Sequence, residues 1–359
     1  GQVTITGVNG QTLNYTGTAS AHNANVSANG SNYVSGITGL SNGTGLASNY
    51  VLPSLSSYSA NNSVTISQAT ASINAAKTYD SNTSLTPGQV SITGVNGQTL
   101  NYTGTAVANN ANVAANATNY VSGITGLSDG TGLASNYVLP SQSAKSGNNQ
   151  ATINAVTTAV NIIGNSQSGT YNATQQSVNG FTATGLVGTD TASNITGFTA
   201  SGATGTNAGS YANTVGGTNS NYSNVSYTNG SLNIGQATAT INATKTYDSN
   251  TSLTTGQVSI TGVNGQTLNY TGTALANNAN VSANATNYVS GITGLSDGTG
   301  LASNYVLPSQ SAKSGSNQAT INAVTTAVNI VGNSQSGTYN ATQQSVSGFT
   351  AIGLVGTDT

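Results

Sequence analysis

The chain has 359 residues, of which only four are Lys or Arg and six are Asp or Glu, and its formal net charge is −2 at pH 7. So few charges leave a nucleic-acid backbone or an anionic membrane surface little to bind, so we expect no nucleic-acid partner. Cys, Met and Trp are absent, which excludes disulfides and thiol chemistry. No apolar run approaches the roughly 20 residues of a membrane span, so we expect no membrane insertion in this segment.

The residue types predict an all-β fold. Gly, Asn, Ser and Thr dominate while Glu, Arg and Met are missing, a composition that favours turns and strands over helices. Val, Ile, Leu and Tyr alternate with polar residues over short runs, which is typical of half-buried strands and not of disorder. We expect tandem small β-sandwich or β-grasp-like domains in an elongated array, with a β-solenoid as the alternative.

Internal repeats divide the chain. The phrase INA recurs at Ile73, Ile153, Ile241 and Ile321, at spacings of 80, 88 and 80 residues, so two repeat types alternate. These periods exceed the roughly 20 to 45 residues of a solenoid rung and suit small β-domains. We predict first-type repeats at residues 1–67, 68–149 and 236–317, and second-type repeats at 150–235 and 318–359. The first and last repeats are incomplete, and we expect a longer array.

The apolar pattern changes phase between repeats. Leu232 and Ile234 alternate in one phase, whereas Ala237, Ala239 and Ile241 alternate in the other. Because a strand has a period of two residues, the change turns the apolar side chains to the opposite face. We therefore expect the last strand of one domain to pass almost directly into the first strand of the next. Leu232 and Ile241 are then predicted to lie in separate, self-contained cores.

The string ITGVNGQTLNYTGTA occurs from Ile5, Ile92 and Ile260, and it predicts a β-hairpin in every first-type repeat. A two-residue loop would place the apolar residues of the two strands on opposite faces. A three-residue loop over 95–97 pairs Ile92 with Leu100 and gives Gly97 the left-handed conformation of a bulge. Further strands are predicted over 119–124, 136–139 and 151–156.

Few residues could serve catalysis. His22 is the only histidine, and the matching positions of the other first-type repeats hold Asn109 and Asn277. A general base or metal ligand replaced in this way is better interpreted as a surface loop residue. No Glu is present and no other Ser-His-Asp arrangement can be assembled. We expect no enzymatic activity, no cofactor, and no catalytic or metal-binding residues.

The stretch Asp80-Ser81-Asn82-Thr83-Ser84, repeated from Asp248, spaces its oxygen atoms like the opening of a calcium loop. It lacks the Gly at the sixth position and the bidentate Glu at the twelfth. We therefore predict an Asx-turn. Calcium binding stays open only if separate loops converge in space.

Other acidic residues also favour turns. Asp129-Gly130 and Asp297-Gly298 correspond to Asn42-Gly43 in the first repeat, so an uncharged residue does the same work. That replacement favours turn geometry over metal binding. Asp190 and Asp358, both in the sequence GTDT, have no acidic neighbour.

Lys77 and Lys145, together with Asp80 and Asp129, bring two basic and two acidic groups into one first-type repeat. Solvated charges are the main interpretation. The alternative is an intramolecular Lys-Asn isopeptide bond, which would need a buried acid beside the pair.

Tyr provides most of the aromatic residues. Tyr102, Tyr120 and Tyr137 recur in the first-type repeats, and we expect core packing with the hydroxyl reaching a partner at the sheet edge. The triplets Asn-x-Ser/Thr, for example at Asn101, Asn116 and Asn172, permit glycosylation without predicting it.

Longer motifs suggest a family. KTYDSNTSL at Lys77 and Lys245, followed by VSITGVNGQTLNYTGTA and SNYVLP, resembles the YDG repeats of very large bacterial surface proteins, including adhesins of the filamentous-haemagglutinin type. GTYNATQQSV, NAGSYANTV and SNYSNVSYTNGSLNI in the second repeat type resemble the accompanying MBG domains. Ser81 stands where the name YDG leads one to expect Gly. The resemblance implies adhesion or surface scaffolding, without a shared ligand or catalytic site.

These observations predict a structural extracellular protein, a stalk, fibre or filament of a bacterial cell surface or biofilm matrix. Near-zero charge removes the repulsion between neighbours, so we expect self-association with identical chains. The alternative is an adhesive module whose loops bind glycans or host proteins, with identical repeats providing avidity. An ice-binding Thr array is disfavoured, because Thr-x-Thr does not recur at a short fixed spacing.

Overall fold

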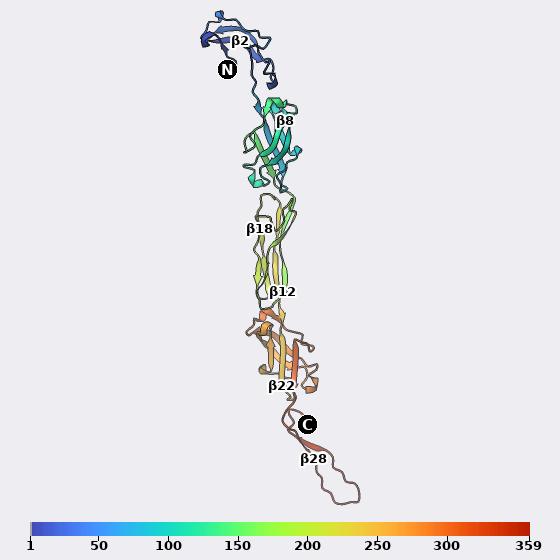
Figure 1. The fold of residues 1–359 in the computed structure, drawn as a ribbon. Helices are drawn as coiled ribbons and strands as arrows, with labels where there is room; N and C mark the ends of the chain where they lie inside the picture. The colour runs from blue at the N-terminus through green and yellow to red at the C-terminus, as the bar shows by residue number, and fades with distance from the viewer. Residues whose placement is uncertain (1) are drawn as a thin grey trace. The chain divides into compact units, whose positions relative to one another are not determined.

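The computed structural model describes residues 2–359 and confirms the all-β prediction (Figure 1). The described residues form 29 strands in ten sheets, contain no α-helix, and form no solenoid. No helix among them has the length and apolar character needed to cross a membrane. Short 3-10 helices of three residues connect the strands: η1 (Val8–Gly10), η2 (Val26–Ala28), η3 (Ala47–Asn49), η4 (Pro87–Gln89), η5 (Val95–Gly97), η6 (Val113–Ala115), η7 (Ala134–Asn136), η8 (Thr255–Gln257), η9 (Val263–Gly265), η10 (Val281–Ala283) and η11 (Ala302–Asn304).

The chain divides into two compact units. Unit 1 contains residues 1–160, 185–196 and 218–225, and unit 2 contains residues 161–184, 197–217 and 226–359. Segments of the second-type repeat at 150–235 thus belong to both units. The five repeat boundaries drawn from the sequence stay a prediction, and each unit is described by itself.

The first-type repeat is built on one mixed sheet. In unit 1 its strands follow the order β10-β5-β6-β7-β8, antiparallel except for the parallel pairing of β5 with β10. The strands are β4 (Ala69–Thr70), β5 (Ser72–Thr78), β6 (Val90–Thr93), β7 (Thr99–Ala108), β8 (Val121–Asp129), β9 (Tyr137–Val138) and β10 (Asn149–Asn154), with β4 and β9 as a separate pair. The N-terminal repeat contains β1 (Ile5–Thr6), β2 (Thr12–Ala21) and β3 (Val34–Asn42).

Unit 2 repeats this sheet in the order β25-β24-β23-β22-β27. Its strands are β21 (Ala237–Thr238), β22 (Thr240–Thr246), β23 (Val258–Thr261), β24 (Thr267–Ala276), β25 (Val289–Asp297), β26 (Tyr305–Val306) and β27 (Asn317–Asn322). The second repeat type consists of shorter strands: β11 (Val160–Gly164), β12 (Gln167–Thr170), β13 (Gln176–Val178), β14 (Phe181–Thr184), β15 (Phe198–Ala200), β16 (Ala203–Gly205), β17 (Gly209–Asn213), β18 (Val215–Gly217), β19 (Val225–Thr228), β20 (Gly230–Gly235), β28 (Asn329–Gly332) and β29 (Phe349–Ile352).

The predicted hairpin register is confirmed. Ile92 pairs with Leu100, and both side chains are buried. Gly97 has φ 76°, the left-handed conformation that the three-residue loop requires. Asn96 is also left-handed, with φ 55°, and Asn tolerates this region better than most side chains.

The phase change between repeats is confirmed, but its predicted consequence is wrong. Strand β20 ends at Gly235 and β21 begins at Ala237, and burial passes from Leu232 and Ile234 to Ala237 and Ile241, in the other phase. Leu232 and Ile241 nevertheless belong to one contiguous cluster of buried residues. Rings that pack across the boundary, described below, join the cores that the sequence analysis separated.

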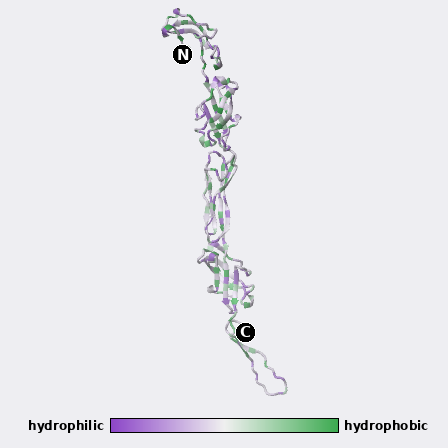
Figure 2. Cartoon of the chain, in the orientation of Figure 1, coloured by the Kyte–Doolittle hydropathy of each residue, from purple (hydrophilic) through white to green (hydrophobic). Residues whose placement is uncertain are grey.

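Hydropathy alternates along the strands instead of gathering in one segment (Figure 2). Strand β5 turns every second residue inward: Ile73, Ala75 and Lys77 are buried and the intervening residues are not. In β5 the buried face thus includes a lysine, and buried polar residues of this kind form the sites described next.

Candidate functional site: polar clamps between successive repeats

Buried polar residues are nearly all asparagines. Nine Asn and two Lys are buried, and no buried side-chain nitrogen or oxygen among the described residues lacks a hydrogen-bond partner. An Asn amide carries a donor and an acceptor like those of a peptide group, so it can take the place of a strand residue in a ladder.

Asn149 shows this use of the amide. Its Oδ1 accepts from the Val121 N–H at 2.9 Å, and its Nδ2 donates to the Val121 carbonyl at 2.9 Å. Because Asn149 begins β10 and Val121 begins β8, one side chain joins the two edge strands of the sheet. Asn116 pairs in the same way with the backbone of Ile153, so glycosylation there would remove a structural pair of hydrogen bonds.

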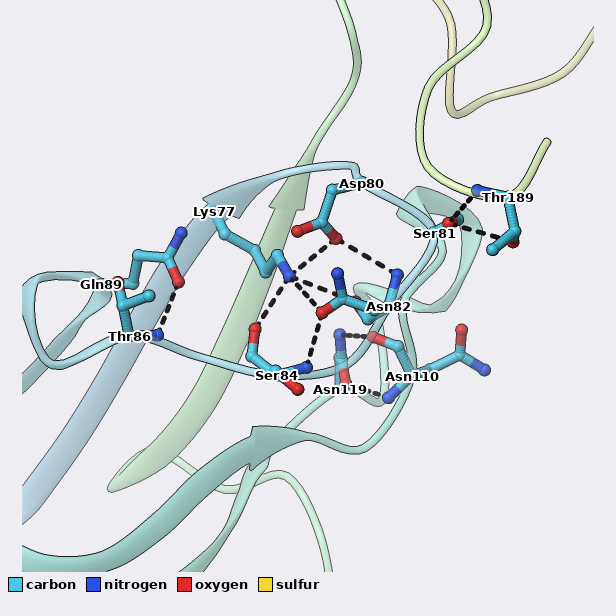
Figure 3. A network of polar contacts seen from close by, with 10 residues as sticks. All are labelled: Lys77, Asp80, Ser81, Asn82, Ser84, Thr86, Gln89, Asn110, Asn119 and Thr189. Carbon is cyan, nitrogen blue, oxygen red and sulfur yellow. Dashed lines mark hydrogen bonds and ion pairs between the residues drawn. The ribbon is translucent and has the colours of Figure 1, made fainter.

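The two buried lysines correct the prediction of solvated charges. The Lys77 Nζ lies 2.7 Å from Asp80 Oδ1 and donates to the Ser84 carbonyl at 2.8 Å and to Asn82 Oδ1 at 3.1 Å (Figure 3). Lys245 has the equivalent contacts in unit 2. Lys145 is exposed as expected. Burial of an ammonium group requires this number of partners.

The predicted Asx-turn is confirmed at the same loop. Asn82 donates its backbone N–H to Asp80 Oδ1 at 3.2 Å, and Ser84 donates to Asn82 Oδ1 at 2.9 Å. The oxygens that resemble a calcium loop converge on the Lys77 ammonium, so the loop carries its own cation. A Lys-Asn isopeptide bond at this loop would need a buried acid beside Lys77 and Asn82. The acid beside them is Asp80, and its side chain is 44% exposed.

Asp248 shows the electrostatic effect of the lysine. Desolvation favours its neutral form, but the hydrogen bond and the charge of Lys245, with the backbone N–H of Asn250, outweigh it and lower the pKa of the carboxyl. The loop is thus held by an ion pair at neutral pH.

Ser81 combines a left-handed backbone with a side-chain contact. Its φ is 65°, in the left-handed region where Gly is expected. Ser81 Oγ accepts from the Thr189 N–H at 2.8 Å and from the Thr189 hydroxyl at 3.2 Å (Figure 3). A Gly would adopt this backbone at lower cost but could not make the contact. The Lys77 loop therefore presents Ser81 and its neighbour Tyr79 to the next repeat.

At the acid junction, which we define as Tyr79, Asp190 and Tyr222, two hydroxyls share one carboxylate. Asp190 Oδ2 accepts from Tyr79 at 2.9 Å and from Tyr222 at 2.7 Å, and the two rings meet edge to face with centroids 5.7 Å apart. The Tyr222 oxygen also accepts from the Val187 N–H at 3.2 Å. Burial, followed by the hydrogen bond to Asp190, raises the pKa of Tyr79 to about 12, and burial also raises the pKa of Tyr222.

At the amide junction in unit 2, which we define as Tyr171, Gln266 and Tyr305, an amide oxygen takes the place of the carboxylate. Gln266 Oε1 accepts from Tyr171 at 3.1 Å and from Tyr305 at 2.6 Å, and the ring centroids are 5.3 Å apart, again edge to face. The Tyr305 oxygen accepts from the Val263 N–H at 2.9 Å. This ring pair belongs to the buried cluster that contains Leu232 and Ile241.

Asn221, which precedes Tyr222 of the acid junction, binds the preceding repeat. Asn221 Oδ1 accepts from the Val113 N–H at 2.9 Å, and its Nδ2 donates to Asn112 Oδ1 at 2.8 Å. Val113 is the first residue of η6, and the N–H group of a first helical residue has no carbonyl partner within the helix. The bond therefore satisfies a donor that the preceding repeat leaves open.

The same hook recurs at two other junctions. In unit 1, Asn136 bonds the Val26 N–H at 2.9 Å and Asn25 Oδ1 at 2.8 Å. In unit 2, Asn304 bonds the Ala208 N–H at 2.7 Å and Asn207 Oδ1 at 3.0 Å. We call the hook and the adjacent tyrosine the Asn–Tyr clamp. At the Asn221 and Asn304 hooks, the adjacent tyrosine also shares its acceptor with a tyrosine of the preceding repeat.

The clamp has a short sequence signal that was missed. Ser-Asn-Tyr stands at all three hooks, at 135–137, 220–222 and 303–305, in two repeat types whose sequences otherwise differ. The triplet also stands at 31–33 and 48–50, and Asn32 bonds the backbone of Asn23 in its own repeat, so the triplet alone does not specify a hook. The Tyr137 hydroxyl accepts from the Val95 N–H at 3.0 Å and donates to Gln98, which confirms its expected polar partner. Tyr102 and Tyr120 are only half-buried.

The remaining candidate residues have local roles. His22 is exposed just after β2 and stacks on Tyr33, with ring centroids 4.4 Å apart. Asp129 Oδ1 accepts from the Ala134 N–H at 2.7 Å, and Asn42 makes the equivalent bond to the Ala47 N–H at 2.8 Å. The turn role predicted from the Asp-for-Asn replacement is confirmed. In residues 2–359, no three His, Cys, Asp or Glu side chains form a cluster that could hold a metal ion.

Comparison with known proteins adds no family assignment: no family model, curated protein or solved structure matches the chain.

Proposed function

We propose that the chain is a structural segment of an extracellular or cell-surface protein, a stalk or fibre in which the Asn–Tyr clamps hold successive β-repeats against bending and pulling. The observation that carries the proposal is the recurrence of the hook at Asn136, Asn221 and Asn304, in both repeat types. A protein whose repeats acted independently would have no need of matching contacts between them.

The energetics support this role. A hydrogen bond contributes roughly 0.5–1.5 kcal/mol net, and an edge-to-face ring pair contributes a similar amount. Two bonds of the hook, the shared acceptor and the ring pair together amount to several kcal/mol at one junction. That sum is comparable with the stability of a small domain, so a clamped junction resists opening about as strongly as the repeat resists unfolding.

Composition and resemblance support the setting. Four lysines and the absence of Arg leave few sites for trypsin-like proteases, and without Cys or Met there is little to oxidise. The resemblance to YDG and MBG repeats agrees with a bacterial surface or matrix location. Self-association with identical chains and the lack of catalysis belong to the same proposal.

A triple substitution tests the mechanical role. Asn136, Asn221 and Asn304 are replaced by Ala, and single chains are stretched in a force spectrometer while solution scattering reports their dimensions. We expect lower opening forces and a broader range of dimensions, because each junction loses its hook.

The matched control replaces Asn61, Asn109 and Asn277 by Ala, since their side chains are exposed and make no hydrogen bond with the described residues. Forces and dimensions that are the same in both triple variants would contradict the proposal. Saturable binding of the intact chain on a glycan array would favour the adhesive alternative instead.

A further inference from the structure

Asn-Gly steps recur along the chain, and the structure divides them into two groups. At such a step the side-chain amide can react with the next backbone nitrogen, because Gly has no side chain to shield that nitrogen and leaves the backbone free to turn. The sequence contains seven Asn-Gly steps. What differs among them is whether hydrogen bonds hold the asparagine in place.

Four of the steps are held. The side-chain oxygens of Asn29, Asn42 and Asn229 accept backbone N–H groups at 2.8, 2.8 and 3.1 Å. At the fourth step, the carbonyls of Asn179 and Gly180 accept side-chain amides at 2.8 and 2.9 Å. The rotation that brings the side-chain carbon to the next nitrogen would disturb these hydrogen bonds, so each held step is protected.

The other three steps, at Asn9, Asn96 and Asn264, form the tips of the repeated hairpins. These asparagines are exposed, and their side chains make no hydrogen bond with the described residues. Asn96 has φ 55° and Asn264 has φ 54°, a left-handed conformation that is costly for a residue with a side chain. A side-chain carbon added at Gly97 or Gly265 would meet no atom within 4 Å. The surroundings therefore leave each tip free to move.

In unit 2 the tip lies between the two residues that hold a clamp tyrosine. The Val263 N–H donates to the Tyr305 oxygen at 2.9 Å, and Gln266 Oε1 accepts from the same hydroxyl at 2.6 Å. Asn264 and Gly265 are the residues between Val263 and Gln266. The length of the backbone at the tip thus sets the distance between the two groups that hold Tyr305.

The tip in unit 1 is connected in the same way. The Val95 N–H donates to the Tyr137 oxygen at 3.0 Å, and the Tyr137 hydroxyl donates to Gln98. Gly94 lies so close to this ring that a side-chain carbon added there would overlap it. A change in the backbone at Asn96 cannot be absorbed without moving the tyrosine of the clamp.

We propose that Asn96 and Asn264 are sites of spontaneous backbone rearrangement, which releases the Asn–Tyr clamps as the protein ages. The Gly nitrogen attacks the side-chain carbon of the Asn and forms a new C–N bond. The bond from that carbon to the amide nitrogen breaks, and ammonia leaves with the proton of the Gly nitrogen. Water then opens the cyclic imide at one of its two carbonyls, which gives aspartate or isoaspartate. Water is the only co-reactant, and nothing is oxidised or reduced.

Isoaspartate is the product that alters the junction. It routes the main chain through the former side chain and so adds a carbon atom between Val263 and Gln266. The two groups that hold the Tyr305 hydroxyl then no longer lie at their present spacing. Either product also places a carboxylate at the amide junction. The release step rests on the proposed clamp function, whereas the rearrangement itself does not.

Ageing of the intact 359-residue chain at mildly alkaline pH tests the rearrangement. Fragmentation mass spectrometry would locate isoaspartate, and we expect it to form about three- to tenfold faster at Asn96 and Asn264 than at Asn42 and Asn229, whose amides are held by hydrogen bonds. A short peptide with the sequence of residues 92–100 is the reference. The inference is overturned by equal rates at the four sites, or by no conversion at Asn96 and Asn264 after the reference peptide has converted.

Hydrogen exchange on the aged chain tests the release of the clamp. The Val263 N–H should exchange about two- to tenfold faster once isoaspartate has formed, because it loses its bond to Tyr305. Asn264→Gln, whose longer side chain closes the ring poorly, should keep the exchange at Val263 unchanged while Asn96 in the same chain converts. Each chain is compared with its own unaged sample, which separates the effect of the substitution from that of ageing.

Isoaspartate at Asn264 without faster exchange at Val263 would overturn the release step. Equal acceleration in Asn264→Gln would overturn it as well. Neither measurement applies force to the chain, so a failure of this inference is distinguishable from a failure of the mechanical role proposed above.

Discussion

At the acid junction two tyrosine hydroxyls share the carboxylate of Asp190, whereas at the amide junction two tyrosine hydroxyls share the amide oxygen of Gln266. The rings meet edge to face in both, and in both the second tyrosine also accepts a backbone N–H. The comparison teaches that the geometry of the tyrosine pair is the constant feature. The acceptor needs only an sp² oxygen, and a carboxylate adds sensitivity to charge.

The loops that present the first tyrosine also differ. Tyr79 follows the buried Lys77 and precedes an Asx-turn that is closed around the ammonium group. Tyr171 precedes a simpler turn, in which Asn172 Oδ1 accepts from the Thr174 N–H at 2.9 Å without any lysine. The acid junction is therefore expected to depend on charge at two points, and the amide junction at none.

The largest difference between the junctions is expected from Lys77→Met. The substitution leaves two backbone carbonyls and the Asp80 carboxylate without their shared donor, and we expect unit 1 to lose about 2–4 kcal/mol of unfolding free energy. Hydrogen exchange would report the loss at residues 77–84. Lys145→Met is the control, since Lys145 is exposed and its ammonium group donates only to the Asn116 carbonyl among the described residues. It should change stability by less than about 0.5 kcal/mol. Equal losses for the two variants would show that burial of Lys77 contributes nothing.

The next largest difference is expected at alkaline pH, where the acid junction should lose more stability than the amide junction. The pKa of Tyr79 is raised to about 12 in the folded chain, against about 10 for an unperturbed tyrosine. The stability from neutral Tyr79 is therefore complete below about pH 10 and is lost as the pH rises through 12, a change of at most about 3 kcal/mol. Burial also raises the pKa of Tyr305, but no carboxylate lies at its hydroxyl, so the amide junction should lose less stability than the acid junction.

Denaturant unfolding followed by hydrogen exchange on both sides of this pH range would measure the difference. Asp190→Asn should lower the pKa of Tyr79 and make the pH dependence of the two junctions more similar. If hydrogen exchange shows the same loss of protection at both junctions in the unmodified chain, the carboxylate of Asp190 has no part in the alkaline response.

A smaller effect is expected from removing each acceptor. Asp190→Ala and Gln266→Ala each leave two hydroxyls without a protein acceptor, and since both acceptors are half-exposed, water replaces part of the loss. We expect about 1–2 kcal/mol for each, confined to the unit that carries the substitution. Thermal unfolding with localised hydrogen exchange would test this, and an effect in the opposite unit would contradict the assignment.

The smallest effects should have opposite signs. Ala173 is left-handed with φ 61°, so Ala173→Gly should stabilise the Tyr171 turn by about 0.5–1 kcal/mol. Ser81→Gly also relieves a left-handed residue, but it removes the bond from the Thr189 N–H, so we expect no gain or a loss of about 0.5 kcal/mol. Equal stabilisation by Ala173→Gly and Ser81→Gly would mean that the hydrogen bond to Ser81 contributes no stability. Melting temperatures of the two variants decide the point.

Local features could be predicted from the sequence. The pairing of Ile92 with Leu100 followed from alternation and loop length, and the turn at Asp80 followed from Asx chemistry, because both depend on residues close in the chain. The burial of Lys77 was missed because two of its four acceptors are backbone carbonyls, which have no sequence signature.

The junctions could not be predicted in the same way. Tyr79 and Asp190 are 111 residues apart, and no periodicity connects residues in different repeats. The separation of Leu232 from Ile241 failed for the same reason, since rings from two repeats close the gap between their cores. The usable signal was the Ser-Asn-Tyr triplet shared by two unrelated repeat types, together with the return of the Tyr–Asp spacing at Tyr247 and Asp358.

A double-mutant cycle between Tyr79 and Asp190 tests the central claim most directly. Unfolding free energies of unit 1 would be measured for Tyr79→Phe, Asp190→Ala and the double variant. If successive repeats are clamped through this contact, the cycle should give a coupling energy of about 1 kcal/mol. Effects that add to within about 0.3 kcal/mol would contradict the clamp, because they would show that residues of the two repeats do not interact.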